Sequence, residues 1–258
     1  TSPTATAALG RALTAGAIMG VMMKNEQDTL TLKINGGGPV GNILVVAKNG
    51  GRVKGYVDHP LADVEPKSKG KLDVGALVGN NGNLTIIMDL GLKEPYVGQS
   101  KLVTGEIAED LASFYLLSEQ QPSAVSLGVL VDRDRTVIAA GGYVIQLLPD
   151  ISDEDITKIE NTLAIIEPVS TLIAKGLSPE EIMDKILGDF EMKILDKIDL
   201  NFQCDCSREK IERVIISLGK KEIEDIIKED GNAEVVCQYC NKEYHFNKEE
   251  LGKILIDL

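Results

Sequence analysis

The four cysteines of this chain constrain its fold more than any other feature, because they occur as two close pairs near the end of the sequence. The pairs are Cys204-Asp205-Cys206 and Cys237-Gln238-Tyr239-Cys240, and no cysteine precedes them. Thiolate sulfur is a preferred ligand of Zn²⁺, which takes four ligands in a tetrahedron. The residues between the pairs can form two short helices that return the chain to the metal. The spacing therefore predicts one Zn²⁺ bound by Cys204, Cys206, Cys237 and Cys240.

Composition and charge argue against several classes of function. The chain has 258 residues, enough for a sizeable core and a second, smaller unit. Its net charge of −13 and its lack of tryptophan disfavour nucleic-acid binding, which depends on cationic and aromatic side chains. Residues 150–200 carry five Lys and Arg against thirteen Asp and Glu, a composition typical of a solvated, weakly packed segment.

The nearly uncharged stretch from Thr4 to Met23 is long enough to be considered as a membrane span. Arg11 lies near its middle, and Ala, Gly and Thr are commoner in it than Leu, Ile and Phe, so we expect a helix buried in a protein core. No signal peptide is expected, and reduced thiols that hold a metal are typical of the cytoplasm. We therefore expect a cytoplasmic protein that does not span a membrane.

Residues 1–149 are expected to form an α+β core domain with a mixed, largely antiparallel sheet. The expected strands are Thr29 to Ile34, Asn42 to Ala47, Arg52 to Val57, Leu84 to Met88, Val125 to Val131 and Thr136 to Ile145, and the expected helix is Glu106 to Leu117. The turn from Gly36 to Gly41 matches the GxGxxG pattern of dinucleotide sites, but a strand follows it where a helix is needed. We interpret its glycines as turn residues. His59 stands alone in a polar loop, and with no catalytic constellation evident we expect no enzyme.

Residues 150–200 are expected to form an acidic helical linker, in which Ser152 and Ser178 cap helices. Residues 201–258 are expected to form a small C-terminal zinc domain with the order strand, Cys-x-Cys, two helices, Cys-x-x-Cys, strand and helix. His245 could bind a metal in principle. Because four cysteines already complete a tetrahedron, we expect His245 to be a partly exposed strand residue.

The sequence resembles, over essentially its whole length, the redox-regulated bacterial heat-shock holdases called the thirty-three-kilodalton chaperonins. The segments that carry the resemblance are the two cysteine pairs, Thr4 to Arg11, Gly36 to Gly41, Ser118 to Ser123 and Ala140 to Pro149. Members of that family usually carry a strand region before the first helix, so this sequence is expected to lack an N-terminal piece.

The resemblance implies an ATP-independent chaperone that is inactive when reduced and zinc-bound. Oxidants would convert the thiolates to disulfides and release zinc. The zinc domain and the linker would then unfold, and the protein, usually as a homodimer, would bind unfolding client proteins. Because each pair is separated by only one or two residues, we predict the disulfides Cys204–Cys206 and Cys237–Cys240, the first of which requires local unfolding.

Two other classes of function stay open from the sequence. A constitutive zinc ribbon that serves as an interaction module fits the four cysteines, although residues 201–258 hold nine Lys and Arg against thirteen Asp and Glu, which disfavours nucleic acid. A thiol-disulfide oxidoreductase normally has one reactive Cys-x-x-Cys at a helix N-terminus, whereas this chain has two pairs that can share one metal. Zinc release measured together with client binding separates the three classes.

Overall fold

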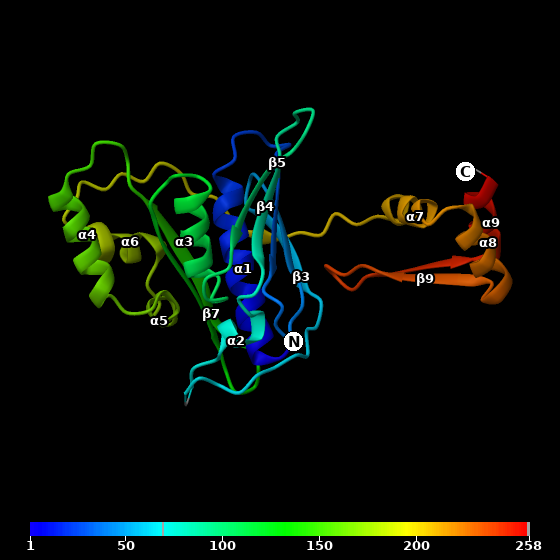
Figure 1. The fold of residues 1–258 in the computed structure, drawn as a ribbon, viewed down its shortest axis with the longest axis horizontal. Coiled ribbons are helices and arrows are strands. Elements are labelled where there is room, and N and C mark those ends of the chain that lie inside the picture. Colours follow the sequence, from blue (N-terminus) through cyan, green and yellow to red (C-terminus); the bar gives the residue numbers. More distant parts are fainter. Residues whose placement is uncertain (69, 257–258) are drawn as a thin grey trace. The chain divides into compact units, whose positions relative to one another are not determined.

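The computed structural model describes residues 1–68 and 70–256 and has an α+β fold that divides into two compact units, residues 1–202 and 203–258 (Figure 1). A six-stranded sheet lies at the centre of the first unit. Its strands, in spatial order, are β5 (Tyr96–Lys101), β4 (Asn83–Asp89), β1 (Thr29–Asn35), β2 (Ile43–Lys48), β3 (Arg52–Val57) and β8 (Asn201–Phe202). All neighbouring strands are antiparallel except β3 and β8, which are parallel. The predicted mixed, largely antiparallel sheet is confirmed.

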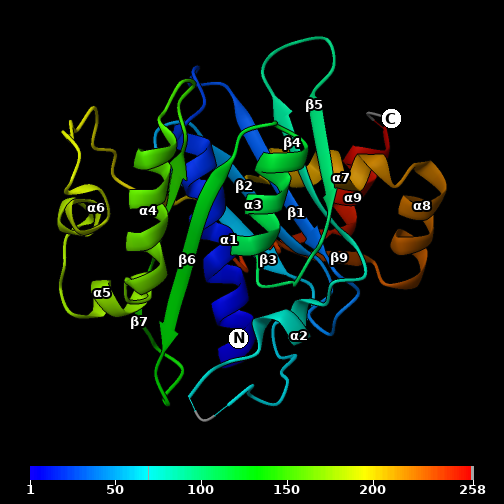
Figure 2. The same cartoon turned by 60° about the vertical axis from the view of Figure 1, so that its left-hand side comes forward.

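The helix α1 (Pro3–Val21) forms the middle layer of this unit. Ser2 caps it, because the Ser2 Oγ accepts a hydrogen bond of 3.0 Å from the amide of Ala5. Figure 2 shows α1 between the six-stranded sheet and the hairpin of β6 (Ser123–Val131) and β7 (Val137–Gln146). Most of its buried residues are Ala or Gly, whose small size lets both layers approach the helix closely. The predicted buried helix is confirmed, and within the described chain no helix combines the length and apolar character needed to cross a membrane.

The core of the first unit lies where α1 meets the sheet. Alternate residues of the central strands are fully buried there: Leu30, Leu32, Ile34, Ile43, Val45, Ala47, Leu84 and Ile86. The helices α2 (Val74–Val78) and α3 (Ala108–Leu117) add Leu77, Leu111 and Phe114 to the same core. The alternating pattern read from the sequence therefore corresponds to one buried face of the sheet.

Gly36 and Gly38 of the GxGxxG turn pack directly against the backbone of α2 and of the residue that follows it. A Cβ at Gly36 would lie 2.0 Å from the carbonyl oxygen of Gly79, and one at Gly38 would lie 2.4 Å from that of Leu77. Gly37 and Gly41 also have positive φ angles of 74° and 73°. The turn therefore crosses the end of α2 in direct contact, which confirms that its glycines serve the turn and leaves no helix N-terminus to bind a phosphate.

Two strands differ from the sequence-based expectation. β5 was not predicted, because its Gly, Gln, Ser and Lys residues are not typical of a buried strand. It is an edge strand of the sheet, and its Gly98 packs against the ring of Phe114. The strand expected at the start of the zinc domain is β8, but it belongs to the first unit, where it pairs with β3. Asn201 donates its amide to the carbonyl of Gly51 at 2.8 Å, and this long-range contact is not visible in a local sequence pattern.

The helices α4 (Asp153–Ile165), α5 (Val169–Ala174) and α6 (Pro179–Leu187) pack on the β6–β7 hairpin. Ser152 and Ser178 cap α4 and α6 as predicted, and Ser178 forms a capping box with Glu181. The buried residues of this cluster are Ile145, Val169, Leu172, Ile182 and Ile186. Residues 191–200, which lead to β8, are exposed and form no helix or strand.

The second unit contains α7 (Arg208–Ser217), α8 (Lys220–Glu229), the hairpin of β9 (Asn232–Val236) and β10 (Glu243–Asn247), and α9 (Lys248–Ile256). Ser207 caps α7, and Asn247 exchanges hydrogen bonds with Glu250 at the start of α9. The order of elements after the first cysteine pair is the predicted order with one addition, the strand β9 between α8 and the second cysteine pair.

Candidate metal centre

The structure brings the two cysteine pairs together. The sulfur atoms of Cys204, Cys206, Cys237 and Cys240 all lie within 4.8 Å of one another. The Sγ atoms are 3.6 Å apart for Cys204 and Cys237, and 3.5 Å apart for Cys206 and Cys240. In a tetrahedral zinc–thiolate site with Zn–S bonds of about 2.3 Å, neighbouring sulfurs are about 3.8 Å apart. The donor set and its spacing therefore fit a metal ion that prefers four thiolates.

Local backbone structure explains how each pair presents its sulfurs. Cys204 and Cys206 lie in the irregular segment between β8 and the cap of α7, and both of their sulfurs reach the group formed with Cys237 and Cys240. Cys237 and Cys240 lie in the tight turn between β9 and β10. In that turn Cys237 accepts a hydrogen bond of 2.8 Å from the amide of Asn241, which has a positive φ of 56°. The pairing of β9 with β10 thus fixes the turn that carries Cys237 and Cys240, the second cysteine pair.

The sulfurs also form part of the hydrophobic core of the second unit. Cys237 is buried in a cluster with Ile211, Ile215, Ile223, Tyr244, Phe246, Leu251 and Ile254. The other three cysteines are partly buried and pack against this cluster. A metal held by these sulfurs would therefore cross-link the chain before α7 to the β9–β10 hairpin at the edge of a small core.

The thiols of Cys204 and Cys206 differ in acidity because their surroundings differ. Tyr244 donates its hydroxyl to the sulfur of Cys206 at 3.1 Å, and this bond lowers the pKa of Cys206 to about 7. Burial raises the pKa of Cys204 to about 12. The bond from Tyr244 was not predicted, because nothing in the sequence indicates which strand residue faces the sulfurs.

The two histidines lie outside this group. His59 is exposed in the loop after β3, and the His245 side chain is 64% exposed on β10, with its Nδ1 3.3 Å from a carboxylate oxygen of Glu234. The metal-competent group in the described chain contains cysteines alone. His245 is therefore an exposed strand residue, in line with the expectation from the sequence.

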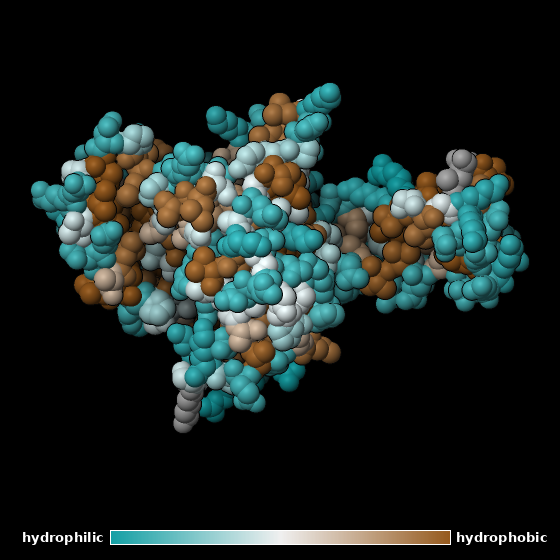
Figure 3. Space-filling view, viewed as in Figure 1, coloured by the Kyte–Doolittle hydropathy of each residue, from teal (hydrophilic) through white to brown (hydrophobic). Residues whose placement is uncertain are grey.

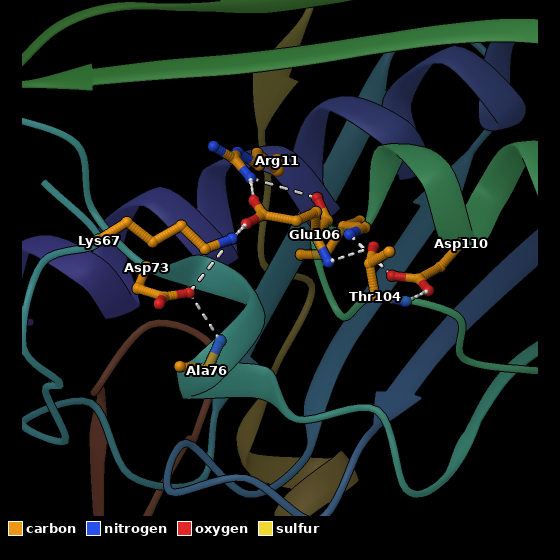
Figure 4. Close-up of polar contacts among 8 residues, drawn as sticks. Arg11, Lys67, Asp73, Ala76, Thr104, Glu106 and Asp110 are labelled. Carbon is orange, nitrogen blue, oxygen red and sulfur yellow. Dashed lines mark hydrogen bonds and ion pairs between the residues drawn. The ribbon is translucent and has the colours of Figure 1, made fainter.

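A polar cluster in the first unit joins segments that are far apart in sequence (Figure 4). The Glu106 carboxylate accepts hydrogen bonds from Arg11 of α1, at 2.6 Å, and from Lys67 of the loop before α2. Lys67 also lies 3.4 Å from Asp73, which caps α2. Burial would raise the pKa of Glu106, but its hydrogen bonds with Lys67 and Arg11 outweigh burial and lower it. These charges pair with one another, so the cluster holds the loop to the core and offers no poised acid or base.

The buried Asp110 has a related structural role in the turn before α3. Its side chain is fully buried and accepts hydrogen bonds from the amides of Val103, Thr104 and Ile107 at 2.7, 3.0 and 2.9 Å. Ile107 has a positive φ of 72°, so the carboxylate stabilises an otherwise unfavourable turn. This turn ends the irregular segment and explains why α3 begins two residues after the predicted start.

Comparison with known proteins identifies the family. The family described as "Hsp33 protein" matches residues 1–247. A protein named "33 kDa chaperonin" from Alkaliphilus oremlandii is 54% identical over 98% of this chain and 85% of its own length, and one from Clostridium botulinum is 50% identical over 98% and 86%. The crystal structure of a 33 kDa chaperonin (heat shock protein 33 homolog) from Thermotoga maritima matches with a TM-score of 0.90 and 38% identity, covering 98% of this chain and 86% of that one. The resemblance seen in the sequence is confirmed, and the chain belongs to the Hsp33 family.

Proposed function

We propose that this protein is a redox-controlled, ATP-independent chaperone that is inactive when reduced and binds unfolding proteins when oxidised. The observation that carries this proposal is the position of the four sulfurs inside the core of the second unit, directly after a weakly packed linker. The relatives named 33 kDa chaperonin support a chaperone rather than an enzyme. A site that needs reduced thiols suits the cytoplasm, where we place the protein.

In the reduced form we expect Cys204, Cys206, Cys237 and Cys240 to hold one Zn²⁺. Zinc keeps its thiolate ligands deprotonated and contributes about 10–16 kcal/mol of apparent folding free energy in small zinc peptides. A unit of this size has a marginal core without such a cross-link. The second unit is therefore expected to fold only while its four thiolates are intact.

Oxidation removes the ligands in pairs. Two thiolates give two electrons to one molecule of peroxide, and with two protons from solvent the peroxide leaves as two molecules of water while one disulfide forms. Two molecules of peroxide thus convert all four thiolates to two disulfides. Disulfide sulfur is a poor ligand for a divalent cation, so the sulfurs no longer hold zinc and the unit loses its cross-link.

We propose the disulfides Cys204–Cys206 and Cys237–Cys240. Chain separation favours these local pairs once the unit loosens, because closing a short loop costs less entropy than closing a long one. An extended Cys-x-Cys has Cα atoms about 6.6 Å apart, near the upper limit for a disulfide, so the first pair needs a local bend. Activation should therefore require oxidant together with an unfolding stress.

Loss of the second unit would free the linker. Residues 150–200 depend on α4, α5 and α6 packing against the β6–β7 hairpin, and Figure 3 shows apolar side chains gathered over these helices. Ile165 and Leu195 are already 85% exposed, and Leu148 is 76% exposed. Unfolding of the linker would expose the apolar side chains that are now buried between the linker helices and the β6–β7 hairpin. The enlarged apolar surface would bind apolar segments of client proteins and a second copy of the chain.

The experiment is a light-scattering assay of a heat-denatured client, without nucleotide, on reduced and on oxidised protein. Suppression of aggregation by the oxidised form alone, with release of one zinc per chain and a shift to dimers, is the expected result. Equal suppression by both forms would instead indicate a constitutive interaction module. Catalytic turnover of a dithiol substrate would indicate an oxidoreductase.

A further inference from the structure

Tyr244 places a hydrogen-bond donor on one of the four sulfurs. Its hydroxyl lies 3.1 Å from the Cys206 Sγ, and the residue is 5% exposed within the core of the second unit. Tyr244 is on β10 directly opposite Val235 of β9, the strand that leads into the second cysteine pair. The hairpin that carries Cys237 and Cys240 therefore also fixes the donor to Cys206.

The sulfur that receives this bond is also close to a cysteine of the other pair. The Sγ atoms of Cys206 and Cys240 are 3.5 Å apart. If Cys240 were oxidised while the unit is still folded, Cys206 would be well placed to attack it. That attack would give a disulfide between the pairs, whereas we expect one within the Cys-x-x-Cys turn. Proximity alone does not explain a preference for Cys237 as the partner of Cys240.

A hydrogen bond to a thiolate draws electron density from the sulfur and makes it a weaker nucleophile. In a site where every cysteine is held as a thiolate, such a bond lowers reactivity without changing how many sulfurs are deprotonated. We propose that Tyr244 is a specificity-determining residue whose hydroxyl restrains Cys206, so that oxidised Cys240 pairs with Cys237. This inference rests on the proposed zinc–thiolate site and its oxidation.

The proposed sequence of bonds is as follows. The Cys240 thiolate attacks a peroxide oxygen and becomes a sulfenic acid, and the other peroxide oxygen leaves as hydroxide and takes a proton from solvent. The Cys237 thiolate then attacks the Cys240 sulfur, which forms the disulfide and displaces a second hydroxide. Two electrons pass from the two sulfurs to one peroxide. Cys206 and Cys204 remain thiolates until the unit opens.

Digestion with trypsin distinguishes a disulfide within a cysteine pair from one between the pairs. Cleavage after Lys197 and Arg208 leaves the first cysteine pair in residues 198–208, and cleavage after Lys228 and Lys242 leaves the second pair in residues 229–242. A disulfide within a pair therefore leaves two separate peptides, and a disulfide between pairs joins them. The reduced, zinc-loaded full chain is treated with one equivalent of hydrogen peroxide, quenched by alkylation and digested without reductant.

We expect mainly the internal disulfide of residues 229–242 in the wild type, and a rise of up to about tenfold in the joined peptide in Tyr244→Phe, since one hydrogen bond to a charged group is lost. Tyr96→Phe, which removes a tyrosine hydroxyl of the first unit that donates to Glu119, is the control and should match the wild type. A joined peptide as the main wild-type product, or an unchanged map in Tyr244→Phe, would overturn the inference.

A second measurement separates this inference from the proposed function. Alkylation of Cys206 by iodoacetamide in the reduced, zinc-loaded protein involves no oxidation and no client. Tyr244→Phe should accelerate it, and an equal rate would overturn the role of the hydroxyl even if oxidation activates the chaperone. Should Tyr244→Phe not bind zinc, 3-fluorotyrosine at position 244 provides a stronger donor in the same ring. It should slow alkylation of Cys206, and an unchanged rate would again overturn the inference.

Discussion

The turn between β2 and β3 offers a direct test of how the end of the linker is held to the six-stranded sheet. Gly50 and Gly51 are neighbours in this turn and have similar positive φ angles, 79° and 74°. A Cβ at Gly50 would meet no atom within 4 Å. A Cβ at Gly51 would lie 2.3 Å from the carbonyl oxygen of Asp199 and 3.1 Å from the side chain of Ile198. Gly51→Ala should therefore displace the end of the linker, and Gly50→Ala is its matched control.

The free-energy cost of Gly51→Ala can be worked out from the contacts that the new side chain would disturb. Both substitutions strain the left-handed backbone, by about 1–2 kcal/mol each. Gly51→Ala in addition pushes the chain away from the edge of the sheet, where Asn201 donates to Gly51 at 2.8 Å and β8 pairs with β3 over two residues. Loss of one or two such hydrogen bonds costs about 1–2 kcal/mol, which corresponds to roughly a 5–30-fold change in the open population.

Hydrogen exchange on the reduced, zinc-loaded protein measures this population. We expect amide exchange in residues 199–202 to accelerate in Gly51→Ala and to stay at the wild-type rate in Gly50→Ala. Both variants lose stability in global unfolding through backbone strain, and Gly51→Ala loses more because it also weakens the contact with β8. Equal exchange rates in residues 199–202 of the two variants would refute the idea that the absence of a side chain at Gly51 allows the end of the linker to pack at the sheet edge.

Three further predictions concern the metal, the linker and the polar cluster. Changing any one of the four cysteines to serine should lower bound zinc well below one per chain, measured by metal analysis, and stoichiometric zinc in two such variants would exclude a four-sulfur site. On oxidation, residues 150–200 should lose hydrogen-exchange protection while most of residues 1–149 keep it; equal linker protection in both redox forms would contradict this. Glu106→Gln should cost about 1–3 kcal/mol at pH 7 in denaturant unfolding. The pKa of Glu106 is lowered in the folded protein, so the carboxylate contributes to the free energy of unfolding above the ordinary pKa of 4.5, and this contribution is lost as the pH falls below it. A stability difference between the wild type and Glu106→Gln that persists at low pH would count against the ion pairs.

The parts of the fold that could be predicted from the sequence are those set by neighbouring residues. Alternating apolar residues mark β1 and β2, because each strand buries one face. Ser152 and Ser178 mark helix starts, because a hydroxyl satisfies a free amide locally. The cysteine pairs could be assigned to one site for a similar reason, since metal geometry restricts ligand spacing much more tightly than packing restricts apolar residues.

The parts that could not be predicted depend on contacts between distant segments. β8 is a strand only because Gly51 leaves room for it beside β3, and its two residues carry no pattern of their own. Glu106 could not be matched with Arg11 or Lys67, because charged residues are common and the fold decides which of them meet. The same limit applies to Tyr244, whose contact with Cys206 requires the register of the β9–β10 hairpin.

The sizes of the hydrophobic clusters suggest why loss of the metal would spread through the chain in one direction. In the described residues, the cluster around α1 and the six-stranded sheet contains twenty-eight buried residues, whereas that of the second unit contains eight, one of them a cysteine, and that of the linker five. Cooperative units with little buried apolar surface open first. The unit that depends on the sulfurs is followed, going back along the chain, by β8, which pairs with β3 over only two residues, and then by the linker helices with their small buried cluster. In the proposed mechanism these differences set an order, in which the second unit opens first, the linker follows, and the large core remains folded.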